Sequence, residues 1–97
     1  MKNVSAQAFD HFKSMRSTNV RRAILEIVER ANPYALPEEQ LAVELNGMVR
    51  PPAGTAELDE EILFLQSRAY IATVPDPLDN NLVKWAITEA GMAMLRH

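Results

Sequence analysis

The spacing of the apolar residues changes at Tyr70, from the period of helices to that of strands. Before Tyr70 the apolar side chains recur about every 3.6 positions, which is the period of helices that bury one face. After it, residues 70–74 and 82–87 take the period of two that is typical of strands. Residues 75–81 form a connection between them that is too long for a tight two-residue turn. The chain is therefore predicted to fold as a run of helices followed by a hairpin with a long tip.

Turn-forming residues and prolines divide the helical part into short elements. The segment Arg16–Asn19 holds three residues that favour caps and turns, and we expect it to separate two helices. Thr55 is expected to cap the helix that follows it. The predicted helices cover residues 5–16, 19–31, 37–47 and 55–68, with a short final helix from Thr88. On the second strand, the side chains expected to face inward are Val83, Trp85 and Ile87.

The composition is that of one small globular domain, with 97 residues of which 47% are apolar and 24% charged. No apolar run approaches the ~18 residues of a membrane-spanning helix, and the N-terminus lacks the apolar region of a secretory signal. The absence of cysteine excludes a disulfide framework. We therefore expect a cytoplasmic protein without a membrane segment. A net charge of -3 does not draw the chain as a whole toward a polyanion.

Side chains suited to catalysis or metal binding are sparse. The two histidines, His11 and His97, stand in no spacing with other ligands that would suggest a transition-metal site. Glu57, Glu60 and Glu61 could in principle hold a hard cation, but an acidic first turn that complements the helix dipole explains them better. The chain has neither a phosphate-cradling glycine loop nor a nucleophile motif. We expect no enzyme activity, no metal and no cofactor.

The residues after the predicted hairpin carry the most suggestive local motif. The run Ile87–Leu95 resembles the apolar-Thr-x-x-Gly-x-x-x-Leu segment that follows the wing in MarR-like and PadR-like regulators, which belong to the winged helix-turn-helix superfamily. Thr88 would cap the final helix, and Gly91 would permit close packing. The resemblance implies an α+β, mostly helical fold, namely a winged helix with an extra N-terminal helix, a three-helix core, a two-stranded wing hairpin and a short C-terminal helix. Residues 1–18 would form the helical extension and residues 19–97 the winged-helix domain.

The resemblance also implies a role for each DNA-facing element. Residues 55–68 would be the recognition helix in the major groove, and residues 75–81 would be the wing that reaches phosphate or the minor groove. Base edges are usually read by Arg, Lys, Asn and Gln, and a helical projection places none of these on the outward face of the helix. The side chains expected on that face are Ala56, Glu57, Glu60, Leu63, Phe64 and Ser67. Since the wing adds Asp76 and Asp79 but no cation, ordinary recognition-helix binding is disfavoured.

Two other groups of residues are candidates for contact with a partner. Basic residues around the junction of the first two predicted helices and in the loop before residue 55 would contact phosphates, although such a cluster is more often a solvated face. These candidates are Lys13, Arg16, Arg21, Arg22 and Arg50. Leu63 and Phe64 are large apolar side chains on an outward face, so either the first helix folds back over them or they form a contact surface. The candidate interface residues are Phe9, Phe12, Glu60, Leu63 and Phe64.

Two functions follow from these features. The fold favours a non-catalytic role in transcriptional regulation or another DNA transaction, with DNA as the partner and a homodimer formed through the first helix. The acidic outward face favours an alternative, in which the winged helix is a protein-interaction module that docks a protein partner on the acidic and partly apolar helix at 55–68. Binding to duplex DNA distinguishes the two.

Overall fold

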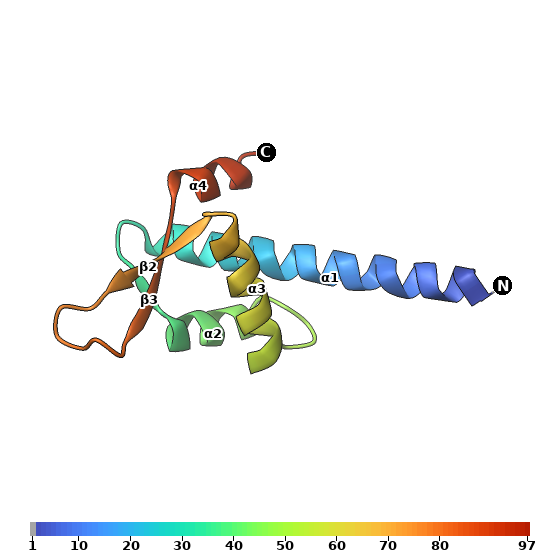
Figure 1. The fold of residues 1–97 in the computed structure, drawn as a ribbon, viewed down its shortest axis with the longest axis horizontal. Helices are drawn as coiled ribbons and strands as arrows, with labels where there is room; N and C mark the ends of the chain where they lie inside the picture. Colours follow the sequence, from blue (N-terminus) through green and yellow to red (C-terminus); the bar gives the residue numbers. More distant parts are fainter. Residues whose placement is uncertain (1) are drawn as a thin grey trace.

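The computed structural model describes the backbone of residues 2–97 and the side chains of residues 11–97. Helices come first and a hairpin and a short helix follow, as predicted, but the first two predicted helices are one helix and an additional short strand precedes the helix at Glu38–Asn46 (Figure 1). The elements are α1 (Lys2–Ala31), β1 (Leu36–Pro37), α2 (Glu38–Asn46), α3 (Thr55–Ser67), β2 (Ile71–Pro75), β3 (Val83–Ile87) and α4 (Glu89–Leu95). The α+β, mostly helical architecture is confirmed. Within residues 2–97 no helix is both long and apolar enough to span a membrane.

Helix α1 is one long helix, so the predicted break at Arg16–Asn19 is wrong. Thr18 Oγ1 donates a hydrogen bond to the carbonyl oxygen of Ser14, 3.0 Å away. This bond satisfies the hydroxyl inside the helix, so a residue that favours turns does not end it. Val20 is fully buried and anchors the continuous helix in the domain. The N-terminal part of α1 extends away from the rest of the molecule (Figure 1).

The C-terminal half of α1 forms the centre of the hydrophobic core. It packs against α2, α3, β3 and α4, and the buried side chains of these elements make one cluster. Burial of each large aliphatic side chain contributes about 1.5–3 kcal/mol. The largest of those with almost no exposed surface are Ile24, Ile27, Leu41, Leu45, Leu65 and Ile71. Helices α2 and α3 are therefore held on α1 as one helix-turn-helix unit.

Three short antiparallel strands form a sheet in the order β1-β3-β2. The sequence does not predict strand β1, because two residues are too few to show the alternation of a strand. Leu36 of this strand pairs with Trp85. Trp85 and Ile87 are buried as predicted, whereas Val83 is 44% exposed. Val83 pairs with Pro75 where the hairpin extends past the helices (Figure 1). The inward orientation predicted for Val83 is therefore wrong.

The segment after the hairpin has the predicted geometry. Thr88 Oγ1 accepts a hydrogen bond from the N–H of Gly91 at 3.1 Å and so caps α4. Gly91 is buried directly against the carbonyl oxygen of Tyr70, and a Cβ at this position would also lie 2.8 Å from Ile87 Cγ1. Only a residue without a Cβ lets α4 pack this close to the junction of α3 and β2.

Helices α2 and α3 begin and end within one residue of the predicted boundaries. The predicted cap of α3 is wrong, because the N-cap residue is Gly54 and no side chain bonds there. Thr55 is the first residue of the helix itself. The loop between α2 and α3 is closed instead by Asn46, whose Oδ1 accepts a hydrogen bond from the N–H of Ala53 at 3.1 Å. This bond fixes the start of α3 relative to the end of α2.

Candidate nucleic-acid interface

The exposed face of α3 is rotated relative to the predicted one. Glu57 and Phe64, which the helical projection places outward, are half-buried and touch α1, whereas Asp59 and Gln66 are exposed. The prediction that this face carries no Asn or Gln is therefore wrong, since Gln66 is of a residue type that reads base edges. The exposed side chains, here called the outward stripe, are Thr55, Ala56, Asp59, Glu60, Leu63, Gln66 and Ser67.

Arg16 on α1 forms a two-pronged ion pair with Glu57 in the first turn of α3. The Nε of Arg16 donates to Oε2 of Glu57 at 2.8 Å, and its Nη2 donates to Oε1 at 3.0 Å. The hydrogen bonds hold the pKa of Glu57 below its usual range and raise the pKa of Arg16 above its own. Both groups are charged across the ordinary pH range, and the charge of each is largely neutralised by the other.

A second ion pair lies one turn further along both helices. The Nε of Arg21 donates to Oε1 of Glu61 at 2.7 Å, and the Glu61 side chain is only 4% exposed. The guanidinium carbon of Arg21 lies 3.5 Å from the centre of the Phe64 ring, and the guanidinium of Arg68 lies 4.8 Å from it. Arg21 is therefore enclosed between a buried carboxylate and an aromatic face, which is a structural setting rather than an open phosphate site.

The five predicted phosphate contacts differ in how freely they can bind an anion. Arg16 and Arg21 are held in the ion pairs with Glu57 and Glu61. Arg50 Nη1 donates to the carbonyl oxygens of Asn46 and Val49, at 2.7 and 2.9 Å, and so caps the end of α2. The remaining two are exposed and form no ion pair among the side chains of residues 11–97. These are Lys13 and Arg22, both on α1.

The interface candidates are spread over α1 and α3. Phe12 on α1 is 67% exposed and Leu63 on α3 is 64% exposed, whereas Phe64 is half-buried under Arg21. Glu60 is exposed on the outward stripe, as Leu63 is. Phe9 lies outside the side chains that the structure describes. Helix α1 thus covers Phe64 and leaves Leu63 open.

The wing is ordered by its own acidic residue. Asp76 Oδ1 accepts hydrogen bonds from the backbone N–H groups of Leu78 and Asp79, at 2.8 and 3.0 Å. Lys84 Nζ lies 3.1 Å from Asp76 Oδ2. The pKa of Asp76 is lowered, first by the bond from the Leu78 N–H and then by Lys84. The one lysine of the hairpin is thereby paired, and the tip exposes Leu78 and Asp79 instead.

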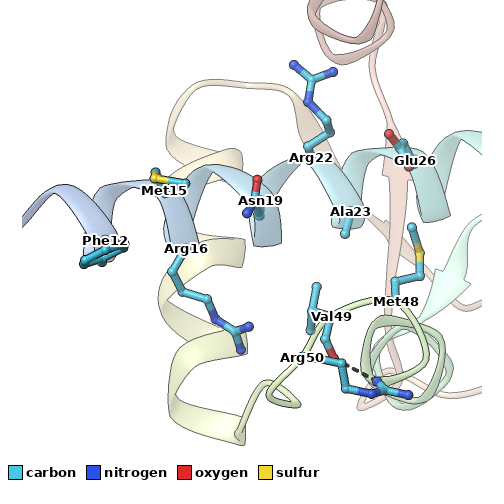
Figure 2. A pocket seen from close by; sticks show the side chains of 10 residues that line it. All are labelled: Phe12, Met15, Arg16, Asn19, Arg22, Ala23, Glu26, Met48, Val49 and Arg50. Carbon is cyan, nitrogen blue, oxygen red and sulfur yellow. Dashed lines mark hydrogen bonds between the residues drawn. The ribbon is translucent and has the colours of Figure 1, made fainter.

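A cavity of about 470 Å³ lies between α1 and the loop that joins α2 to α3 (Figure 2). Arg16, Arg22 and Arg50 reach its lining from different directions, and Figure 2 shows Arg16 and Arg22 pointing to opposite sides of α1. The apolar part of the lining comes from Phe12, Met15, Ala23, Met48 and Val49. Three of the five predicted cations therefore line a cavity from different sides, and they do not form one continuous basic patch.

The carboxylates of α3 are not arranged to share a cation. Glu57 and Glu61 each accept hydrogen bonds from an arginine of α1, while Glu60 faces solvent on the outward stripe. Among the residues that the structure describes, no three His, Asp or Glu side chains gather into a group that could hold a metal ion.

Comparison with known proteins identifies the fold. No family model matches the chain, and no curated protein matches it. The adhesin competence repressor AdcR from Streptococcus pyogenes aligns with 98% of this chain and 64% of its own, with a TM-score of 0.67 and 19% sequence identity. A MarR transcription factor from Planctomyces limnophilus aligns with 99% of this chain and 73% of its own, with a TM-score of 0.65 and 17% identity. ZitR from Lactococcus lactis aligns with 79% of this chain and 47% of its own, with a TM-score of 0.65 and 17% identity.

The chain spans between about half and two thirds of the length of AdcR and ZitR. The likeness to AdcR and to the Planctomyces limnophilus protein covers nearly the whole chain. At these identities the likeness concerns the fold alone, and it assigns the chain to no family. The chain is a winged-helix protein of the architecture found in MarR-type transcription regulators.

Proposed function

We propose that this protein is a cytoplasmic, DNA-binding transcription regulator without enzymatic activity. The observation that carries the proposal is the alignment of nearly the whole chain with solved transcription regulators and repressors. The proposed arrangement places α3 in the major groove and the hairpin β2–β3 beside it as the wing. The alternative function, a protein-interaction module, gains no support from these neighbours.

The ion pairs between α1 and α3 make this role compatible with an acidic recognition helix. Arg16 neutralises Glu57 and Arg21 neutralises Glu61, so two of the acids on α3 repel phosphate much less than their sequence suggests. In this proposal Arg16 and Arg21 act on DNA only through the carboxylates that they hold. Direct phosphate contacts are assigned to Lys13 and Arg22, the two predicted cations of α1 that are exposed and form no ion pair among the side chains of residues 11–97.

Duplex binding should depend on salt and on these two cations. We expect a labelled mixed-sequence duplex to bind at about 50 mM salt and to lose most of its affinity by about 200 mM, as measured by fluorescence anisotropy. Lys13→Gln and Arg22→Gln should each reduce the slope of log affinity against log salt by about 1. Arg96→Gln, the same charge change at an exposed position after α4, is the matched control and should keep the slope.

Two results would contradict this arrangement. Equal slopes for Arg22→Gln, Lys13→Gln and Arg96→Gln would remove the phosphate contacts from α1 while leaving DNA binding in place. Absence of binding at both salt concentrations, for every duplex offered, would contradict the proposed function as a whole.

We also propose that the protein acts as a homodimer through the N-terminal part of α1. This part extends from a molecule that is 57 Å long and 27 Å wide, and it exposes Phe12 and Met15. The sequence places Val4 and Ala8 on the same helical face, which gives an apolar stripe of a kind that helices bury against one another. A two-fold dimer would also present two recognition helices to a pseudo-palindromic site.

The substitution Phe12→Glu is expected to convert the dimer into a folded monomer, because it places a charge in the apolar stripe far from the core. Sedimentation velocity at about 50 µM protein measures the change, since a dimer of ordinary interface size is largely associated at such concentrations. Leu78→Glu, at a 94% exposed apolar residue of the wing, is the control and should stay dimeric. A monomeric parent protein, or a dimeric Phe12→Glu variant, would refute the interface.

A further inference from the structure

The outward stripe of α3 presents an unusual set of chemical groups to a major groove. It exposes two carboxylates, Asp59 and Glu60, the apolar side chains of Ala56 and Leu63, and, toward its C-terminal end, the amide of Gln66. No lysine or arginine lies on it, and the nearest cation along the helix is Arg68, which sits over the Phe64 ring. Between Ala56 and Leu63 the stripe therefore offers carboxylate acceptors and methyl groups, and it carries no charged donor.

Base edges differ in how they meet such a surface. Guanine presents two acceptors, N7 and O6, which repel a carboxylate, and adenine presents an acceptor next to its amino donor. Cytosine presents only the N4 amino donor, and thymine adds a C5-methyl group that favours apolar contact. A carboxylate flanked by apolar side chains thus fits cytosine best, with thymine as the neighbour on the same strand.

Two acids of α3, Asp59 and Glu60, are exposed beside Ala56 and Leu63, and Glu60 has the longer side chain with which to reach a base edge. Ala56, Glu60 and Leu63 follow one another at the i, i+4 and i+7 spacing that lines up one face of a helix. Glu57 and Glu61 already accept hydrogen bonds from Arg16 and Arg21. Within the part of the chain whose side chains the structure describes, Glu60 makes no ion pair and no side-chain hydrogen bond.

We infer that Glu60 is a specificity-determining residue that reads cytosine in the major groove. Its carboxylate accepts a hydrogen bond from the N4 amino group, while Ala56 and Leu63 contact the methyl groups of adjacent thymines. The DNA strand contacted by α3 in each half-site is therefore a short pyrimidine run. At the position that Glu60 contacts, guanine is excluded from that strand. This inference rests on the proposed function, and it specifies which DNA sequences the protein prefers.

The test is a selection of bound duplexes from a randomised library by the full-length protein, followed by anisotropy titrations of the enriched duplex and its single base-pair variants. The parent protein should enrich cytosine at one position of each half-site, and cytosine-to-guanine exchange there should weaken binding about tenfold. Glu60→Gln should move the preference at that position from cytosine to adenine, because an amide pairs with adenine N6 and N7. The other positions of the site should keep their preferences.

Glu39→Gln is the matched control, because it removes the same charge from an exposed position in the first turn of α2. It should raise affinity for all duplexes equally and leave the base preference unchanged. An enriched site whose preferences are the same in Glu60→Gln and the parent protein, or guanine enriched opposite Glu60, overturns this inference and leaves DNA binding intact. If the parent protein enriches no duplex and binds none, the proposed function fails and the inference fails with it.

Discussion

Replacement of Gly91 by alanine is expected to destabilise the protein by about 3 kcal/mol, toward the upper end of the range for overpacked sites. A Cβ at this position would overlap the carbonyl oxygen of Tyr70, and it would lie 2.8 Å from Ile87 Cγ1. The first of these atoms belongs to the backbone, so no rotation of a side chain can make room. To accept the methyl group, α4 must move away from the end of α3 and the start of β2. The Tyr70 carbonyl would then lose its hydrogen bond from the N–H of Thr88.

Urea unfolding measures this effect, with the single buried Trp85 as the fluorescent reporter. Gly54→Ala is the control, because a Cβ there would meet no atom within 4 Å. Gly54 is the N-cap of α3, where alanine is less favourable than glycine, so a loss below about 1 kcal/mol is expected. Equal midpoints for the two variants would show that α4 is not packed on Tyr70 as closely as described.

The sequence predicts the Thr88–Gly91 segment well because its chemistry is local. A threonine whose hydroxyl accepts a hydrogen bond from the N–H three residues later, and a glycine at that later position, can both be predicted from their spacing in the sequence. The same local reasoning fails at Arg16–Asn19. Considered only by their local preferences, the residues of this segment would end a helix. In the structure the Thr18 hydroxyl donates a hydrogen bond to the Ser14 carbonyl oxygen, and the burial of Val20 in the core keeps the helix continuous.

The face of α3 is a harder problem, because its orientation depends on residues that lie 40 or 41 positions away. The apolar spacing predicts a buried face of Leu58, Ile62, Leu65 and Ala69. The first three are buried, whereas Ala69 lies beyond the end of α3 and is exposed. The sequence does not predict that Glu61 is buried as well, because a glutamate is buried only where it is paired, here with Arg21 of α1. The crossing of α1 turns Glu57 inward and Gln66 outward, and this crossing is a property of the fold rather than of any segment.

The substitution with the other large expected effect is Arg21→Ala, which should cost about 3 kcal/mol. It leaves the carboxylate of Glu61 buried without its only arginine, and the removal of one partner from a buried pair is strongly destabilising. The Arg21 side chain is 31% exposed, so water can reach part of the site and the loss should lie at the lower end of the usual range. Contact with the Phe64 ring is lost as well.

Arg16→Ala is the matched control, since Arg16 belongs to the same helix and pairs with the same residue type on α3. The Arg16–Glu57 pair is more open to solvent on its acidic side, and pairs of this kind contribute about 1 kcal/mol or less. Urea unfolding should therefore separate the two variants clearly. Similar losses for Arg16→Ala and Arg21→Ala would mean that Glu61 is hydrated in solution and is not the buried partner described above.

A double replacement then separates the structural role of Arg21 from any contact with DNA. Arg21→Met combined with Glu61→Met replaces the ion pair by apolar side chains of similar volume, a change that is often neutral for stability. This variant should unfold within about 1 kcal/mol of the parent protein while lacking the Arg21 guanidinium. Its affinity for duplex DNA should be unchanged, because the ion pair is neutral overall and its removal does not alter the net charge. The measurement is made at about 50 mM salt, where phosphate contacts contribute most to the affinity. A folded double variant whose salt slope falls by about 1 would instead assign Arg21 a direct phosphate contact and would contradict its assignment as a partner of Glu61 alone.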